Sequence, residues 1–200
     1  MNANEIMKKA FSESAKNYSK VAESQAYQES VLQALSLILE SYKKGGALFV
    51  CGNGGSAADA QHFVAELVVK LSKNRTAIKA FAMSVDTSIL TAAGNDFGYE
   101  TVFSRQVEAN MGKNDILFAI TTSGNSTNVL EAIKACKAVG AKSILLTGHS
   151  GGKGKDMADH TVIAPGENTA QIQEVHLLTY HTLCYLIELG LVEAGLVQYR

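Results

Sequence analysis

Five short apolar runs, separated by stretches with helical spacing, limit most strongly what this chain can fold into. The runs read ALFVC, IKAFAM, ILFAI, SILLT and TVIAP, and they begin at Ala47, Ile78, Ile116, Ser143 and Thr161. Each has the length and composition of a buried strand. Apolar residues recur with helical spacing between them, at 56–71, 101–110 and 128–139. This alternation predicts an α/β fold with a flavodoxin-like doubly wound, five-stranded parallel sheet covered on both faces.

The segment before the first strand reads as helix. Its apolar face consists of Val31, Leu32, Leu35, Ile38 and Leu39. An amphipathic helix must bury such a stripe, and the last predicted helix, at about 169–189, is similarly apolar. We therefore predict a single domain over 1–200, in which 1–45 is an N-terminal helical extension used in oligomer packing.

Composition argues against several classes of partner. The 18 basic and 19 acidic residues give a formal net charge of -1, so we expect neither a nucleic-acid partner nor an anionic membrane surface. The first residues have charges scattered among apolar positions, unlike a signal peptide. No run reaches the roughly 18 apolar residues of a membrane span. Cys51, Cys136 and Cys184 lie far apart, which favours buried thiols in a cytoplasmic protein.

A glycine-rich turn follows the first predicted strand. Gly52, Gly54 and Gly55 allow the backbone to approach a ligand closely. Ser56 and Asp59 have the spacing of a capping box for the next helix. The free amides of that helix start would face an anion or a polar ligand.

The same turn also satisfies part of a dinucleotide-binding fingerprint, through Gly52, Gly54 and Ala57. That fingerprint requires an acidic residue about 20 positions further on. Asp86 follows the second predicted strand but lies too late, so we expect no nucleotide cofactor.

A second loop, after the third predicted strand, concentrates hydroxyl groups directly before a helix. It consists of Thr121, Thr122, Ser123, Gly124, Asn125, Ser126 and Thr127. Phosphate binds short donors at a helix N-terminus, and an ordinary Ser/Thr-rich turn is the alternative. Two further segments are weaker candidates. Residues 95–98 could contribute the Asp96 carboxylate to sugar hydroxyls or simply form a turn, and 148–155 could be a mobile lid, although a solvated loop is favoured.

Polar groups on two helices could perform chemistry. His62 and Glu66 are four residues apart, so they share one helix face. The final helix has Gln173, Glu174, His176 and His181 within an apolar sequence. Each histidine alone favours a structural role, but together with His62 and Glu66 they could form a mixed N/O site for zinc, nickel or iron.

Taken together, these blocks resemble the phosphoheptose isomerases of the sugar isomerase (SIS) domain superfamily. The resemblance rests on CGNGGSAADAQHFVAEL, AAGNDFGYETVFSRQV, TTSGNSTNV, GGKGKDMAD and TAQIQEVHLLTYHTLC, spread over nearly the whole chain. It implies a homotetramer that converts D-sedoheptulose 7-phosphate to D-glycero-D-manno-heptose 7-phosphate for bacterial surface glycans such as lipopolysaccharide.

The resemblance also implies a role for individual residues. Glu66 corresponds to the catalytic base and His181 to its acid/base counterpart. One zinc ion per subunit would be held by His62, Glu66, Gln173 and His181. The implied substrate-binding residues are Asn53, Gly54, Gly55, Ser56, Glu66, Asn95, Asp96, Thr121, Thr122, Ser123, Ser126 and Gln173. His176 falls outside this pattern.

The residues agree with that chemistry, because isomerisation through a cis-enediol needs a carboxylate base and a proton donor at oxygen. Three alternatives stay open: a non-catalytic SIS-domain scaffold such as a replication-initiator-associating protein, a nucleotide-dependent oxidoreductase, and an isomerase of another sugar phosphate. The complete set of His62, Glu66, Gln173 and His181 argues against a scaffold.

Overall fold

A computed structural model describes residues 2–200, and Met1 of the predicted extension lies outside the described residues. Five parallel strands form one sheet in the order β2-β1-β3-β4-β5. The strands are β1 (Leu48–Gly52), β2 (Ala80–Ala82), β3 (Ile116–Thr121), β4 (Lys142–Thr147) and β5 (His160–Ile163). This order is the flavodoxin-like one, so the prediction of the sheet is confirmed.

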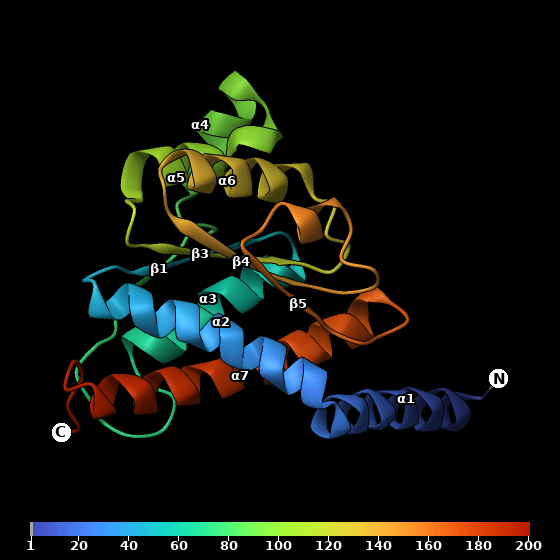
Figure 1. Cartoon of the computed structure of the whole chain (residues 1–200). Coiled ribbons are helices and arrows are strands. Elements are labelled where there is room, and N and C mark those ends of the chain that lie inside the picture. The colour runs from blue at the N-terminus through green and yellow to red at the C-terminus, as the bar shows by residue number, and fades with distance from the viewer. Residues whose placement is uncertain (1) are drawn as a thin grey trace.

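Helices cover both faces of the sheet (Figure 1). One layer contains α2 (Gln25–Lys43), α3 (Gly55–Val68) and α7 (Thr169–Glu193), and the other contains α4 (Thr87–Phe97), α5 (Ser104–Asn110) and α6 (Thr127–Ala138). Short 3₁₀ helices, η1 (Tyr99–Thr101) and η2 (Lys153–Asp156), lie in the connections. Successive side chains of a strand point to opposite faces. In β1, Leu48 and Val50 accordingly pack under α2, α3 and α7, whereas Phe49 and Cys51 pack under the other layer.

The N-terminal segment is divided into two helices that differ in burial. Helix α1 (Ala3–Glu23) ends at Ser24, whose hydroxyl accepts a hydrogen bond from the amide of Tyr27 and caps α2. Helix α2 belongs to the core, but Leu32 of its predicted apolar face is 53% exposed. In α1 only Asn17 and Val21 are buried, and the helix projects from the domain (Figure 1).

Helix α4 was not predicted. Its sequence, TSILTAAGNDF, contains residues typical of turns, and these favoured a loop over a helix in the sequence pattern. The side chain of Asp86 accepts a hydrogen bond from the amide of Ile89 and caps this helix. Asp86, considered above as a dinucleotide ligand, therefore has a structural role.

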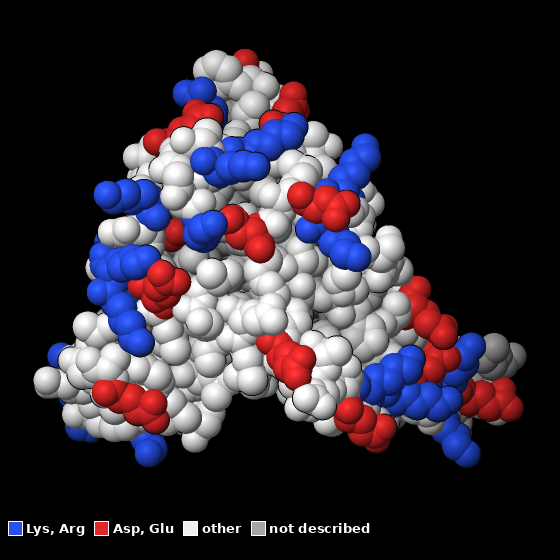
Figure 2. Space-filling view, in the orientation of Figure 1, with Lys and Arg blue, Asp and Glu red and all other residues white. Residues whose placement is uncertain are grey.

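Helix α7 is long and apolar enough, by length and composition, to cross a membrane, but half of its most apolar window is buried within the molecule. It packs against α2 and α3 and closes that face of the core. All three cysteines are free and buried, as predicted, and burial raises the pKa of Cys51 and Cys136 to about 12. On the face shown in Figure 2, basic and acidic side chains are interspersed.

Candidate active site

Two loops that were predicted to bind substrate lie side by side at the carboxyl edge of the sheet. Strands β1 and β3 pair directly, so the loops at their carboxyl ends meet where the chain reverses its direction across the sheet. Ligands of open α/β sheets bind at such a point. The predicted juxtaposition of the two loops is confirmed, and their binding of substrate stays a prediction.

The first loop approaches the start of α3 too closely for side chains. A Cβ atom on Gly52 would lie 2.6 Å from the carbonyl oxygen of Ser56. Gly54, with φ +54°, is the N-cap of α3 and has no side chain that could accept a hydrogen bond from the helix amides. The prediction that Ser56 and Asp59 form the capping box is wrong, because the helix begins at Gly55 and Ser56 is already buried in its first turn. The first amides of α3 are consequently left for other acceptors.

The second loop gathers its hydroxyl groups as a phosphate site requires. The Thr121 hydroxyl lies 2.9 Å from that of Ser126 and 3.4 Å from that of Ser123. Ser126 is the N-cap of α6, yet its side chain makes no cap bond. Thr122 adjoins this cluster and is partly exposed. Short hydroxyl donors and the positive end of the α6 dipole therefore face the same space.

An amide pair joins the two loops. The side chains of Asn53 and Asn128 exchange two hydrogen bonds of 2.8 Å each. The Tyr99 hydroxyl donates to Asn53 Oδ1 at 3.2 Å. Asn128 and Tyr99 were not predicted as site residues, because only the tertiary fold brings them to Asn53.

The two weaker loop candidates differ from the prediction. Asn95 and Asp96 were expected in a loop but belong to the C-terminal end of helix α4. Both side chains are exposed, and Asn95 Nδ2 donates to Asp96 Oδ1 at 2.7 Å. The glycine-rich segment 148–155 is docked on the loop after β3. The amide of Gly154 donates to the carbonyl of Gly124 at 2.9 Å. A Cβ atom on Gly124, with φ +65°, would lie 1.9 Å from the Gly151 carbonyl oxygen.

Three predicted catalytic or metal-binding side chains converge between α3 and α7. One potential ligand atom from each of His62, Glu66 and His181 lies within 4.8 Å of the others. His62 Nε2 is 3.0 Å from Glu66 Oε1 and 3.5 Å from His181 Nε2. A tetrahedral zinc ion with bonds of about 2.0–2.1 Å separates its ligand atoms by about 3.3 Å. The two separations from His62 Nε2 are near this value, and a donor set of two imidazole nitrogens and one carboxylate oxygen suits zinc.

The surroundings of these three groups set their charge and orientation. Burial lowers the pKa of His181, and the neighbouring His62 lowers it further. His62 Nδ1 lies 3.0 Å from the hydroxyl of Tyr180, so its ring is held from the side opposite Glu66. The Glu66 side chain is 18% exposed, whereas that of His62 is 45% exposed. The carboxylate is thus sheltered but reachable.

Gln173 lies nearer the N-terminal end of α7 than His181 does, next to the start of α3. A Cβ atom on Gly55 would be 2.5 Å from Gln173 Nε2, so this carboxamide packs against the first loop. His181 is eight residues further along α7, about 12 Å at 1.5 Å per residue. Within one chain Gln173 therefore contacts the first loop, and its roles as a substrate and zinc ligand stay predictions.

His176 is a core residue. It is fully buried, and its Nε2 donates to the Thr147 carbonyl at 3.0 Å. Burial lowers its pKa to about 4, so the ring is neutral at neutral pH. The structural role favoured for a lone histidine on this helix is confirmed.

Comparisons with known proteins agree with this architecture. A family model described as SIS domain matches residues 10–148. The phosphoheptose isomerase of Campylobacter jejuni subsp. jejuni serotype O:6 is 49% identical over 168 residues, which cover 84% of this chain and 90% of the relative.

Two solved structures are also similar. The phosphoheptose isomerase GmhA from Neisseria gonorrhoeae aligns with a TM-score of 0.87 at 41% identity, over 93% of this chain and 98% of that one. A phosphoheptose isomerase from Francisella tularensis aligns with a TM-score of 0.89 at 35% identity, over 94% and 98% of the two chains.

Proposed function

The chain belongs to the phosphoheptose isomerase family of SIS-domain proteins, and on this premise we propose that it converts D-sedoheptulose 7-phosphate to D-glycero-D-manno-heptose 7-phosphate. The product would supply heptose for bacterial surface glycans. The observation that carries the proposal is the convergence of Glu66 and His62, on the helix that begins at the first loop, with His181 on α7. Relatives with this name favour an enzyme over a non-catalytic scaffold or a nucleotide-dependent oxidoreductase.

Isomerisation of a ketose to an aldose requires proton transfers at carbon and at oxygen. We assign the transfer at carbon to Glu66, which removes a proton from C1 of the ketose and returns it to C2 of the cis-enediol. His181 moves the proton between the two substrate oxygens. The lowered pKa of His181 supports this role, because a neutral imidazole can bind zinc through one nitrogen and still present the N–H group of the other to a substrate oxygen.

The phosphate would occupy the loop after β3. Its ligands are the hydroxyls of Thr121, Thr122, Ser123 and Ser126 together with the first amides of α6. Asn53, Gly54, Gly55, Ser56 and Gln173 would bind the sugar hydroxyls from the first loop and from α7, with Asn95 and Asp96 as further predicted contacts. The Asn53–Asn128 pair keeps the two loops in register.

We infer that zinc is the cofactor, held by His62, Glu66 and His181, with Gln173 as the predicted fourth ligand. When bound, zinc supplies Lewis-acid stabilisation of negative charge on substrate oxygens. The protein holds His62 Nε2 toward Glu66 and His181, which orients the donor set before any metal arrives.

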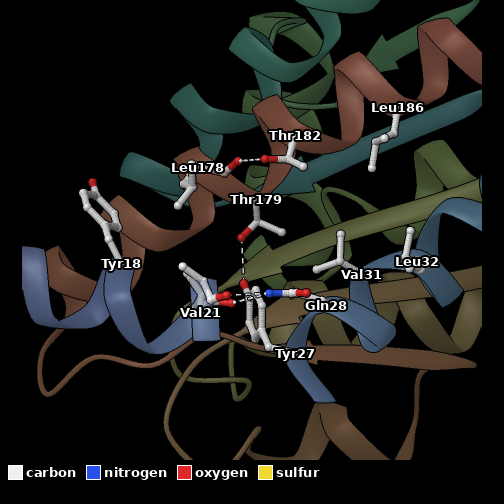
Figure 3. A pocket seen from close by; sticks show the side chains of 11 residues that line it. Tyr18, Val21, Tyr27, Gln28, Val31, Leu32, Leu178, Thr179, Thr182 and Leu186 are labelled. Atoms are coloured by element: carbon white, nitrogen blue, oxygen red, sulfur yellow. Dashed lines mark hydrogen bonds between the residues drawn. The ribbon is translucent and has the colours of Figure 1, made fainter. Parts of the chain in front are cut away.

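A homotetramer is also part of the proposal. An apolar cavity of about 370 Å³ lies between α1, α2 and α7, lined among others by Tyr18, Leu32 and Leu178 (Figure 3). Ile6, Met7 and Phe11 expose further apolar surface on α1, and Phe11 is 72% exposed. Exposed apolar surface of this kind marks protein interfaces. We propose that the tetramer works in the cytoplasm. Light scattering of the purified protein measures the mass of the assembly and so tests whether it is a tetramer.

The substitution Glu66→Gln tests the catalytic assignment. It keeps the size of the side chain but removes the base, so we expect turnover to fall by about 10²–10⁴-fold while sugar-phosphate binding is retained. Glu108→Gln, at an exposed position of α5 across the sheet, is the matched control and should be fully active. Aldose formation and ligand binding are measured for both variants. Normal turnover by Glu66→Gln would remove Glu66 from the role of base.

A further inference from the structure

Tyr180 is a buried tyrosine with a fixed ring. It is fully buried on α7, and its ring stacks on Phe63 with centroids 5.5 Å apart and planes 16° apart. Phe63 is in turn packed edge-on against Phe118 of β3. A buried tyrosine usually finds a partner for its hydroxyl. Packing therefore sets the direction in which this hydroxyl points.

The hydroxyl lies between two side chains of α3. Tyr180 Oη is 3.0 Å from His62 Nδ1 and 3.4 Å from Asp59 Oδ1. Asp59 and His62 are three residues apart, so they share one face of α3. An ionised carboxylate only accepts hydrogen bonds, and a phenol has a single proton to donate. When a cation is bound at Nε2, the arrangement is satisfied if Tyr180 donates to Asp59 and accepts from the Nδ1–H group of His62. Without a cation, Nε2–H can donate to Glu66 and Tyr180 to Nδ1.

This assignment determines the other nitrogen of His62. With the proton on Nδ1, a neutral imidazole has a free lone pair on Nε2. That atom is the one 3.0 Å from Glu66 Oε1 and 3.5 Å from His181 Nε2. The lone pair therefore points to the place where the three candidate ligands converge.

We propose that Tyr180, itself held by Asp59, is a positioning residue that fixes the ring and the Nδ1–H tautomer of His62, leaving Nε2 free to bind a metal ion. The proposal rests on the proposed function in that zinc is the expected ion. The ring nitrogen of a metal-binding histidine that does not bind the metal generally donates its N–H hydrogen bond to a carboxylate, a carbonyl or water. In this chain a tyrosine hydroxyl stands between the histidine and the carboxylate.

The substitution Tyr180→Phe removes only the hydroxyl and keeps the stacked ring. Tyr27→Phe is the matched control, because it removes another tyrosine hydroxyl that bonds to α7, at Thr179 Oγ1 2.6 Å away, but not to His62. Zinc affinity is measured by competition with a chromophoric chelator. Loss of a hydrogen bond to a ligating histidine weakens metal binding by about 10–100-fold. We expect that loss for Tyr180→Phe and an unchanged affinity for Tyr27→Phe.

A second readout does not depend on affinity. Nitrogen-15 NMR of the zinc-loaded protein reports which ring nitrogen of His62 carries the proton. The wild type should show an Nδ1–H group that exchanges slowly with solvent, and Tyr180→Phe should exchange the same proton faster. Asp59→Ala should also weaken zinc binding, because the released phenol proton can then be donated to Nδ1, which leaves the His62 proton on Nε2 although Tyr180 is intact.

The outcomes separate this inference from the proposed function. Unchanged zinc affinity in Tyr180→Phe, or a zinc-loaded wild type whose His62 proton is on Nε2, would overturn the positioning role. A wild-type protein that binds no zinc but shows the Nδ1–H tautomer would instead contradict the metal assignment and keep the hydrogen-bond assignment. Asp59→Ala provides the same test if Tyr180→Phe does not fold.

Discussion

The buried ion pair between Arg75 and Glu188 stabilises the helix that contains Glu66. Arg75 Nε donates to Glu188 Oε2 at 2.8 Å, and both side chains are 1% exposed. The same guanidinium donates to the carbonyls of Glu66 and Leu67, at 2.7 and 2.8 Å, and so satisfies the last turn of α3. The pair therefore fixes the end of α3 to α7 next to the proposed base.

The substitution Glu188→Gln keeps the size of this side chain and leaves Arg75 buried without its counter-charge. Removing one partner of a buried ion pair costs about 3–5 kcal/mol. We expect the lower end, about 3 kcal/mol, because Arg75 keeps carbonyl acceptors at the negative end of the α3 dipole. For a chain of this length, that loss lowers Tm by about 6–12 °C.

Thermal unfolding at one fixed protein concentration and without added zinc measures this loss, because both an oligomer and a bound metal shift Tm. Glu193→Gln, at the exposed end of the same helix, is the control and should unfold like the wild type. The double variant Arg75→Met/Glu188→Gln should lose less stability than the two single variants added together. A Tm of Glu188→Gln equal to that of Glu193→Gln would show that the buried ion pair does not stabilise the fold.

Two further predictions concern the loop and the core. In Gly55→Ala, the new Cβ would lie 2.5 Å from Gln173 Nε2, so the flexible carboxamide must move; we expect a higher KM without loss of stability, and an unchanged KM would contradict the contact. His176 is neutral when folded, with its pKa lowered from 6.5 to about 4, whereas the unfolded chain binds a proton below pH 6.5. Stability should therefore fall as pH decreases from 6.5 to 4, by about 3 kcal/mol from this residue. Denaturant unfolding at pH 7 and pH 4 should show a smaller difference for His176→Gln, and an equal difference would contradict the assignment.

The sheet could be predicted because its strands are covered on both faces. Strands of this kind read as continuous apolar runs, and every residue of β1 and β3 is buried. The predicted runs and the observed strands agree within a few residues at each end. The positions of the two substrate loops followed from the strand order, since both loops come at carboxyl ends of neighbouring strands.

Local signals failed where backbone conformation decided the outcome. Ser56 has the residue type and spacing of an N-cap, but the positive φ of Gly54 starts α3 earlier and buries Ser56. Helix α4 contains Gly94, Asn95 and Asp96, which favour turns in isolation, and it forms with Asp86 as its cap. Tertiary contacts override such weak local preferences.

The candidate site could be predicted only in part, because several of its contacts depend on how the helices and loops pack together. The spacing of His62 and Glu66 predicted that they share one helix face, whereas their approach to His181 depends on how α3 packs against α7. Tyr180 reads as one more apolar residue of α7, and nothing in the sequence marks its hydroxyl as a partner of His62. Asn128 likewise gains its partner Asn53 from 75 positions away.

Proton NMR of the purified protein, with a known zinc content, in D₂O with D-sedoheptulose 7-phosphate would detect the proposed isomerisation itself. We expect an aldose product with deuterium at C2, because Glu66 exchanges the proton that it removes from C1 with solvent before returning it. Glu66→Gln should form this product at least about 10²-fold more slowly. The absence of any aldose product from the wild-type protein, with and without zinc, would contradict the claim that this site isomerises sedoheptulose 7-phosphate.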